Sequence, residues 1–320
     1  MMTTLSQVDG CALSAVSEVP GVADITICVC TYQRMELLER LLQAIAAQRS
    51  DGSFRFSCVI VDNDVSESGR SVVERMQSGF PASIRYSVEP ARNFALVRNH
   101  AVSLASGDLL AFIDDDEVPR EDWLLRMVEL LHKSGADAVL GPVRPYFDRE
   151  PPSWIVRGRV CERPAYPTGT ELHWNQTRTG NVLLRAGMIT EEGLRFDPAF
   201  ASGGEDVDFF RRAAEKGKRF VWCEEAAVYE LVPESRLQRS YYLKRALLQG
   251  RLSAGYAKSF WSKLLTAVKA FAAAVAYTAA LPVLFLLGDH LGMRYLIKDC
   301  HHIARLLTTL GLSPSFGRDF

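Results

Sequence analysis

Strand-like and helix-like segments alternate from Asp24 onward, and this alternation constrains the fold more than any other feature of the chain. The expected strands are Ile25–Cys30, Phe56–Val61, Ile84–Val88 and Asp108–Ile113, and the expected helices are Met35–Gln48, Gly69–Gln77 and Ala95–Ala105. Alternation of this kind predicts an α/β fold, with a mostly parallel sheet flanked by helices on both faces. A further helix is expected over Asp206–Lys216 and a further strand over Phe220–Val228.

Composition sets limits on the class of protein. A chain of 320 residues has room for one large domain with an appendage, or for two domains. A net charge of −1 argues against broad nucleic-acid binding, which needs a basic excess. Seven cysteines without a zinc-like spacing indicate reduced thiols in a cytosolic setting. Residues 1–23 lack the pattern of a signal peptide and are expected to form a loose N-terminal tail.

Four consecutive acids, Asp114, Asp115, Asp116 and Glu117, directly follow an apolar strand segment. Like charges massed at a strand end repel one another unless a cation lies there. In open α/β sheets ligands bind at the carboxyl ends of strands, and hard carboxylate oxygens suit Mg²⁺ or Mn²⁺. The alternative is a solvated acidic turn before a helix that starts near Pro119. The acid run alone does not decide between the two.

Polar residues also follow the first two strands. Thr31, Tyr32 and Arg34 come after the first, and Asp62 and Asn63 after the second. An aromatic ring and a carboxylate at neighbouring strand ends can stack on a base and accept its imide proton, which favours uracil over cytosine. Ordinary turn chemistry is the alternative for Asp62 and Asn63.

Two helix starts carry further charged groups. Arg98 lies a little over one turn after Asn93, which is near an expected helix start, and its guanidinium has the geometry to bind a diphosphate. A solvated surface charge is the alternative for Arg98. Gly203 and Gly204 precede Glu205-Asp206, where a carboxylate can deprotonate an acceptor hydroxyl. The alternative for Asp206 is a helix N-cap.

Taken in order, these motifs resemble the inverting GT-A glycosyltransferases of family 2, over roughly residues 24–250. The motifs are Thr31-Tyr32-Gln33-Arg34, Val61-Asp62-Asn63-Asp64, Arg98-Asn99, Asp114-Asp115-Asp116 and Gly204-Glu205-Asp206. Within that family, four further segments resemble the glucosyltransferases that extend lipid-linked repeat units of succinoglycan-type bacterial exopolysaccharides. They are Gly141-Pro142-Val143, Arg178-Thr179-Gly180-Asn181, Ser202 through Phe210 and Val232-Pro233-Glu234.

The resemblance implies a role for each matched residue. Tyr32 and Asp62 hold the uracil, Asp114 the ribose, and Asp116 an Mg²⁺ or Mn²⁺ ion that bridges the diphosphate. Thr31, Arg34, Asn63, Arg98 and Asp115 complete the nucleotide-sugar site. Asp206 is the general base with Glu205 beside it, and Asn181, Gly203 and Gly204 belong to the loops around donor and acceptor. Tyr229 stands where relatives often carry a His, so the third metal ligand is open.

Residues 251–320 are expected to form a helical, membrane-attaching segment. Ala270–Leu287 is uncharged and flanked by basic residues. As a helix it spans about 27 Å, just short of the roughly 30 Å hydrocarbon core of a bilayer. Pro282 and the many alanines leave three arrangements open: a span, an in-plane helix, or a hairpin packed on the catalytic domain.

The resemblance therefore implies transfer of a hexose to a lipid-linked or glycan acceptor at the cytoplasmic face of the inner membrane. The first expectation for the donor is UDP-glucose, which supplies glucose. Other donors, namely UDP-galactose, UDP-GlcNAc or dTDP-rhamnose, are alternatives. A catalytically silent nucleotide-sugar-binding subunit of a polysaccharide assembly complex is the alternative from another class. No nucleic-acid partner is expected.

Overall fold

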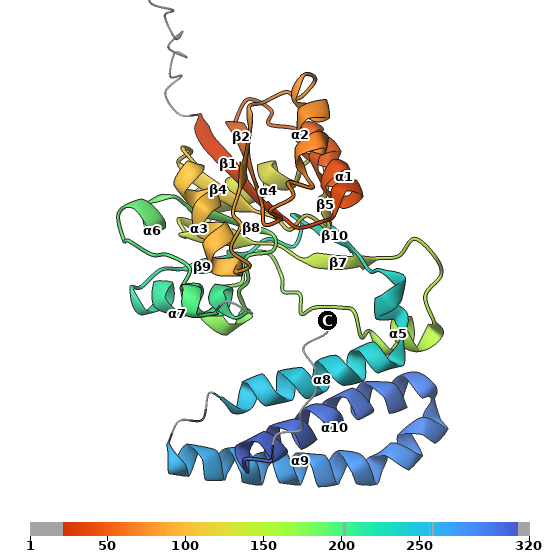
Figure 1. Cartoon of the computed structure of the whole chain (residues 1–320). Helices are drawn as coiled ribbons and strands as arrows, with labels where there is room; N and C mark the ends of the chain where they lie inside the picture. Colours follow the sequence, from red (N-terminus) through yellow and green to blue (C-terminus); the bar gives the residue numbers. More distant parts are fainter. Residues whose placement is uncertain (1–21, 201–202, 256, 258, 313–320) are drawn as a thin grey trace, which may run out of the picture.

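A seven-stranded sheet in the order β3-β2-β1-β4-β8-β6-β9 forms the centre of the protein (Figure 1). The computed structural model describes residues 22–200, 203–255, 257 and 259–312. The strands of this sheet are β1 Ala23–Thr31, β2 Phe54–Asp62, β3 Ile84–Val88, β4 Leu109–Phe112, β6 Ala138–Leu140, β8 Val182–Arg185 and β9 Phe220–Trp222. Strands β3, β2, β1 and β4 are mutually parallel, and β8 runs antiparallel to both of its neighbours. The predicted mostly parallel α/β sheet is confirmed.

Helices cover both faces of this sheet. They are α1 Met35–Ala46, α2 Arg70–Gln77, α3 Phe94–Leu104, α4 Trp123–Ser134, α6 Gly187–Thr190 and α7 Glu205–Glu215. In β1, Ile25, Ile27 and Val29 belong to one apolar core with α1, α2 and α4, whereas Cys28 belongs to the other core with α3 and α7. Successive side chains of a strand point to opposite faces, so one buried strand supplies both cores.

A second, three-stranded sheet in the order β5-β10-β7 lies beside the first. Its strands are β5 Glu117–Pro119, β7 Val143–Tyr146 and β10 Val228–Leu231. Two expectations are corrected here. The helix expected near Pro119 begins at Trp123, because residues 117–119 pair antiparallel with β10. The single strand expected over Phe220–Val228 is two strands, β9 and β10, which belong to different sheets.

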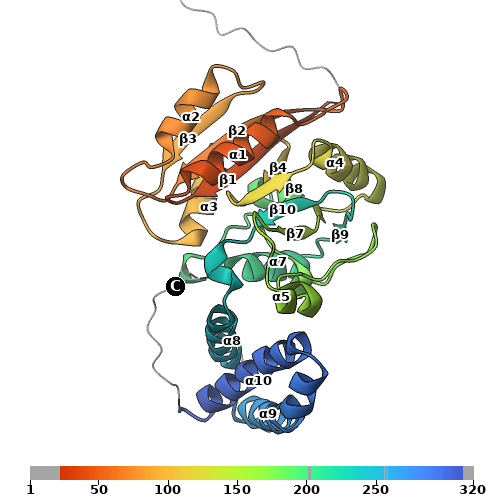
Figure 2. The ribbon, with the colours of Figure 1, turned by 90° about the vertical axis from the view of Figure 1, so that its right-hand side faces the viewer.

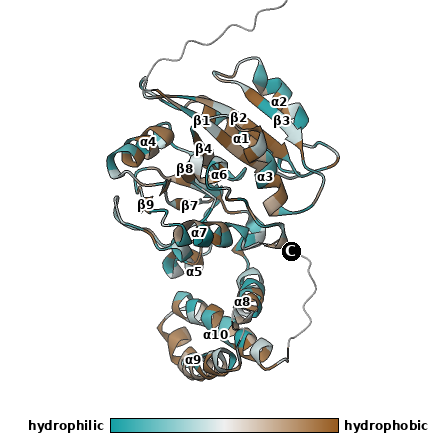
Figure 3. Ribbon diagram, turned by 90° about the vertical axis from the view of Figure 1, so that its left-hand side faces the viewer, coloured by the Kyte–Doolittle hydropathy of each residue, from teal (hydrophilic) through white to brown (hydrophobic). Residues whose placement is uncertain are grey.

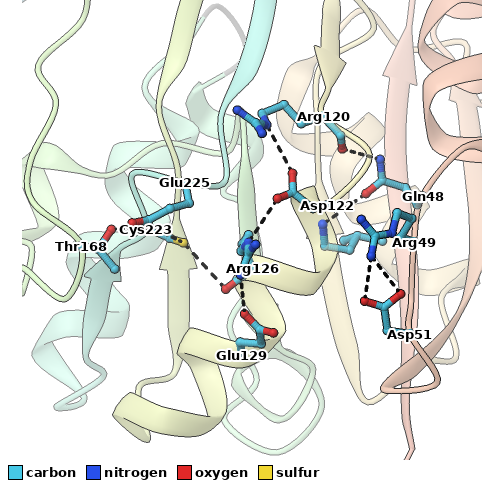
Figure 4. A network of polar contacts seen from close by, with 11 residues as sticks. Gln48, Arg49, Asp51, Arg120, Asp122, Arg126, Glu129, Thr168, Cys223 and Glu225 are labelled. Atoms are coloured by element: carbon cyan, nitrogen blue, oxygen red, sulfur yellow. Dashed lines mark hydrogen bonds and ion pairs between the residues drawn. The ribbon is translucent and has the colours of Figure 1, made fainter.

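Polar contacts fix the corner between β5 and α4 (Figure 4). The Gln48 side chain donates to the Arg120 carbonyl oxygen at 2.7 Å and accepts from the Leu124 N–H at 3.2 Å. Asp122, directly before α4, pairs with Arg120 and Arg126 at 3.3 and 3.1 Å. These contacts join the end of α1 to the start of α4, so the chain that follows the acid run has a fixed path.

Three long helices form a layer on the far side of the molecule from β1 and α2 (Figures 1 and 2). They are α8 Arg239–Ala254, α9 Phe260–Leu287 and α10 Asp289–Thr309. Helix α10 packs against α9, α8 and α5 Ser153–Gly158. A small core of Trp154, Ile155, Tyr242 and Met293 joins α5 to α8 and α10. The expected boundary at residue 250 thus falls inside α8, which belongs to the helical layer.

The long connection between Tyr146 and Thr179 contains α5 and the short 3-10 helix η1 Trp174–Gln176. Two further 3-10 helices are η2 Pro198–Phe200 and η3 Glu234–Leu237. The η3 helix lies in the short link between β10 and α8. The second sheet is therefore connected to the helical layer by only a few residues.

Asn181 is the polar centre of the core between the two sheets. Its side chain is fully buried, accepts from the Trp123 indole N–H at 2.7 Å and donates to the carbonyl oxygens of Ala226 at 2.8 Å and Pro142 at 3.0 Å. Its backbone has φ 60°, in the left-handed region that Asn tolerates better than most residues. Asn181 thus ties α4 to β8 and to the second sheet.

Replacing this amide should destabilise the whole domain. In Asn181→Ala the indole N–H of Trp123 loses its acceptor, and a buried unsatisfied group costs about 1–3 kcal/mol. Urea unfolding followed by tryptophan fluorescence should show a midpoint well below that of the wild type. The exposed Asn175→Ala change is the control and should stay within about 0.5 kcal/mol of the wild type. Equal midpoints for both variants contradict the structural role.

Candidate active site

The carboxyl ends of β1, β2 and β4 meet at one edge of the sheet, because these strands are parallel and adjacent. The Thr31 hydroxyl donates to Asp115 at 2.8 Å, and the Arg34 guanidinium donates to Asp115 at 2.8 Å and to Asp116 at 3.0 Å. Two motifs separated by about eighty residues in the sequence are thereby joined. The structure brings Thr31, Arg34, Asp115 and Asp116 together, as the sequence predicts.

The acid run is largely buried. The side chains of Asp115 and Asp116 are 5% and 13% exposed, and Glu117 is buried, whereas the Asp114 side chain is 44% exposed. Burial raises the pKa of Asp116 to about 6, with Arg34 opposing the shift. Burial and the nearby Asp114 raise the pKa of Glu117 well above its usual range. A solvated acidic turn, the alternative left open by the sequence, is therefore wrong.

Metal binding can be tested against these carboxylates. Within the described part of the chain, no three His, Cys, Asp or Glu side chains form a cluster that could hold a metal ion. Mg²⁺ and its relatives, however, often bind through one or two carboxylates together with substrate phosphates. Asp116 and the exposed Asp114 supply oxygens of this kind, so the residues fit an ion that arrives with a diphosphate.

The residues predicted to bind the nucleobase differ in their surroundings. Asp62 is fully buried and accepts from the backbone N–H of Gly69 at 2.7 Å, from the Tyr86 hydroxyl at 2.8 Å and from the Asp64 N–H at 3.0 Å. Its carboxylate anchors the connection from β2 to α2. The Asn63 amide donates to the carbonyl oxygens of Glu89 and Ala91 at 2.6 and 2.7 Å. The contact of Asp62 with a uracil stays a prediction.

Tyr32 is half-buried, and the Arg92 guanidinium carbon lies 4.7 Å from the centre of its ring. A cation over one ring face stabilises the aromatic side chain in a defined position. Tyr32 stands just after β1, beside the edge where the acid run ends. The base contact predicted for Tyr32 remains a prediction.

Arg98 and Glu205 form a buried ion pair between α3 and α7. Their side chains are 13% and 5% exposed, and Arg98 also lies 3.8 Å from Asp114. Arg98 is therefore not a solvated surface charge. Burial raises the pKa of Glu205, while Arg98 opposes that shift. The pair connects the start of α7 to the acid run, so the two acidic motifs share one site.

Asp206 is the second residue of α7 and is partly exposed. The N-cap is Gly204, at φ 95°, and Gly203 has φ 116°. These positive angles favour glycine, which explains the glycine pair. Capping by Asp206, one of the two alternatives from the sequence, is wrong, since the N-cap is Gly204. Among the described residues, the Asp206 side chain accepts a hydrogen bond only from the adjacent Val207 N–H, at 2.7 Å. Its negative charge adds to the field around Arg98.

The segment from Arg178 to Asn181 borders the acid run. A Cβ atom on Gly180 would lie 2.9 Å from a Glu117 carboxylate oxygen and 3.1 Å from an Asp114 carboxylate oxygen, so a larger residue there would require these two side chains to move. The Asn181 side chain points away from this edge into the core contacts described above. These core contacts hold the segment from Arg178 to Asn181 in place. A direct contact of Asn181 with donor or acceptor stays a prediction.

Arg178 is the residue that sequence reasoning did not select as a site residue. Two of its guanidinium nitrogens, Nε and Nη2, are buried and have no hydrogen-bond partner among the residues that the structure describes. Burial, together with the nearby Arg163, lowers the pKa of Arg178 to about 10. Arg163 and Arg236, by contrast, both pair with Glu230. A buried cation with free donors is typical of a site for an anion, and no periodicity or spacing in the sequence signals it.

A cavity of about 460 Å³ opens behind the acid run, between α1 and the second sheet. Asp115, Asp116, Arg40, Tyr146 and Tyr229 are among the residues that line it. Because Tyr32, Asp62 and Arg98 are not in its lining, the strand edge and not this cavity defines the candidate active site. Tyr229 faces this cavity beside Asp116.

Comparison with known proteins finds two family models and curated relatives that match this chain. The model of glycosyl transferase family 2 matches residues 26–189, and that of glycosyl transferase family group 2 matches residues 109–297. The chain is 37% identical over 232 residues to the succinoglycan biosynthesis protein ExoM of Rhizobium meliloti, covering 71% of this chain and 73% of that protein.

Two solved structures share the fold. The mannosyltransferase PcManGT from Pyrobaculum calidifontis, in complex with GDP-Man and Mn²⁺, has a TM-score of 0.58 at 20% identity, covering 92% of this chain and 91% of that one. S. aureus TarS 1–349 in complex with UDP has a TM-score of 0.54 at 16% identity, covering 90% and 92%. The resemblance drawn from the motifs is confirmed: the chain is a glycosyltransferase with a GT-A fold and belongs to glycosyl transferase family 2.

Proposed function

We propose that this enzyme transfers a hexose to a lipid-linked or glycan acceptor in bacterial exopolysaccharide or cell-surface polysaccharide biosynthesis. The donor that we expect is UDP-glucose. The observation that carries the proposal is the Arg98–Glu205 pair, which joins the acid run to the start of α7. This contact supports a site in which the acid run holds the metal ion and Asp206, next to Glu205, is the base. The likeness to a succinoglycan biosynthesis protein supports the pathway. Neighbours that bind UDP or GDP-Man with Mn²⁺ support a nucleotide-sugar donor and a divalent ion.

Each group in the site has a separate role in the proposed reaction. When bound, Mg²⁺ or Mn²⁺ on Asp116 supplies positive charge to the departing diphosphate. Asp206 removes the proton of the attacking acceptor hydroxyl. The proposed roles include a base but no protein nucleophile, so an α-linked donor gives a β-linkage by inversion. Arg98 holds Glu205 and Asp114 in place around the reacting centre.

A donor screen tests the proposal directly. UDP-glucose, UDP-galactose, UDP-GlcNAc, dTDP-rhamnose and GDP-mannose are each incubated with the full chain and detergent-extracted membrane lipids, and nucleotide release and product linkage are measured. UDP-glucose should give the highest lipid-dependent release and a β-linked product. Turnover of a different donor alone corrects the sugar and keeps the enzyme class. Binding of a donor without lipid-dependent release from any of them points to the silent subunit.

The first prediction concerns the metal. Turnover should stop in EDTA and return with Mn²⁺ or Mg²⁺, because the diphosphate leaving group needs a cation at the acid run. In Asp116→Asn the added ion should no longer restore turnover, whereas the exposed Asp51→Asn change should behave as wild type. Full activity of the wild type in EDTA contradicts the metal role.

The second prediction separates the base from nucleotide binding. Asp206→Asn keeps the shape of the side chain but cannot accept a proton, so transfer should fall by roughly 10²–10⁴-fold. Isothermal titration should give a UDP affinity close to that of the wild type. A parallel loss of UDP affinity shows that Asp206 supports the fold or the nucleotide and is not the base.

The third prediction concerns the unpartnered Arg178. Arg178→Met removes the charge but keeps an apolar chain near Trp222, and no hydrogen bond of Nε or Nη2 to a described residue is lost. The loss of stability should therefore stay well below the roughly 3–5 kcal/mol of breaking a buried ion pair, while transfer falls. Arg98→Met is the matched comparison. It leaves Glu205 buried without its partner and should cost about 3–5 kcal/mol. Unfolding and turnover are measured on both variants; an active Arg178→Met protein means that Arg178 binds no reacting anion.

A further inference from the structure

Charge is segregated between the two parts of this protein. Residues 239–312, which contain α8, α9 and α10, hold ten Lys and Arg but only Asp289 and Asp299, for a net charge of +8. The whole chain has a net charge of −1, so the remaining residues carry −9. A strongly basic layer on an otherwise acidic protein is suited to an anionic surface.

Helix α9 is coloured mostly hydrophobic in Figure 3, and many of its large apolar side chains are exposed. It has a mean hydropathy of 2.1 over its most apolar window, of which only 11% is buried, so it is not the core helix of a soluble bundle. Its buried residues are the small Ala270 and Ala274. Large exposed apolar residues recur three or four positions apart up to Val275 and again from Val283: Phe260, Trp261, Leu264, Leu265, Val268, Phe271, Val275, Val283, Leu286 and Leu287.

The packing of α9 argues against a simple span. Helix α9 lies along α10, and α10 in turn packs on α8 and α5 (Figures 1 and 2). The Thr278 hydroxyl donates to the buried Asp299 at 2.9 Å, and the Tyr277 ring stacks on His302 at 5.7 Å. Helix α10 also carries Arg294 and Lys298, which are exposed. If α9 spanned the bilayer, these polar groups of α10 would either enter the hydrocarbon core with it or lose their contacts with α9. Either change is unfavourable.

We propose that α9 lies in the plane of an anionic membrane, with its exposed apolar face in one leaflet and the basic residues of the layer among the headgroups. The inference builds on the part of the proposed function that places the acceptor in a membrane, and it specifies how the enzyme reaches it. An in-plane helix needs an exposed apolar surface, positive charge close by and protein packed along its other side. Helix α9 exposes large apolar side chains, carries Lys263 and Lys269, and packs along α10. Its 28 residues, about 42 Å at 1.5 Å per residue, exceed the roughly 30 Å hydrocarbon core of a bilayer.

Vesicle flotation of the full chain tests the lipid partner. Phosphatidylcholine vesicles containing phosphatidylglycerol should bind at least about tenfold more protein than phosphatidylcholine alone, and the excess should fall with salt. Val268→Asp with Phe271→Asp should abolish most binding. Arg85→Gln with Lys133→Gln, which makes the same change of net charge on the catalytic part, should leave binding close to wild type.

Tryptophan depth distinguishes the in-plane helix from a span. Trp261, 75% exposed at the start of α9, should be quenched by brominated phosphatidylcholine, and Trp261→Phe should lose that quenching. In the Trp261→Phe background, Phe271→Trp places the probe near the middle of the helix. An in-plane helix gives the same shallow depth for both positions, whereas a spanning helix places residue 271 deeper and overturns the proposal.

Two further outcomes also overturn it. In the first, the protein binds neither kind of vesicle. In the second, it elutes as a dimer that Val268→Asp with Phe271→Asp converts to a monomer, which means that a second copy covers the apolar face. Titration with UDP is run on every variant. Loss of UDP binding with normal flotation counts against the proposed function, and loss of flotation with normal UDP binding counts against the membrane contact.

Discussion

The concentration of carboxylates after β4 is the constraint on which the rest of the site depends. Asp114, Asp115, Asp116 and Glu117 occupy consecutive positions, and most of their side chains are removed from water. Buried charges of one sign require compensation, so arginines come from distant parts of the chain to meet them. Arg34 arrives from the end of β1 and Arg98 from α3. The carboxylates also lie close to Gly180, where an added methyl group would require those of Glu117 and Asp114 to shift.

Much of the parallel half of the fold follows from local patterns. The strands expected at Ile25–Cys30 and Ile84–Val88 and the helix expected from Met35 agree with β1, β3 and α1 to within two residues at each end. Their apolar residues recur regularly because the strand and the helix of each βα unit pack against each other. The second sheet is different, since the partner of β5 is β10, more than a hundred residues away. Three-residue strands such as β5 and β9 carry too little pattern to reveal such a partner.

The site shows the same division between local and distant causes. The acid run and the glycine pair before α7 are visible in the sequence because their chemistry is contiguous. The resemblance predicts Asn181 in the loops around donor and acceptor, and the structure adds a core role, since its amide accepts from the Trp123 indole. The sequence does not signal this role, because an asparagine that packs on a buried tryptophan and one that faces a ligand have the same sequence pattern. Arg178 went unselected for the converse reason. Its significance lies in nitrogens that find no partner, which is a property of three-dimensional surroundings.

The opposite charges of the catalytic part and the helical layer make the molecule an electric dipole. In the field of an anionic surface such a body experiences a torque, which turns its positive end toward the surface before any contact forms. At physiological ionic strength the field decays over about 8 Å, so this alignment acts in the last steps of approach. The acidic end then points toward the solvent. Orientation is thus settled during encounter, and the protein need not search through collisions in which its catalytic part meets the surface first.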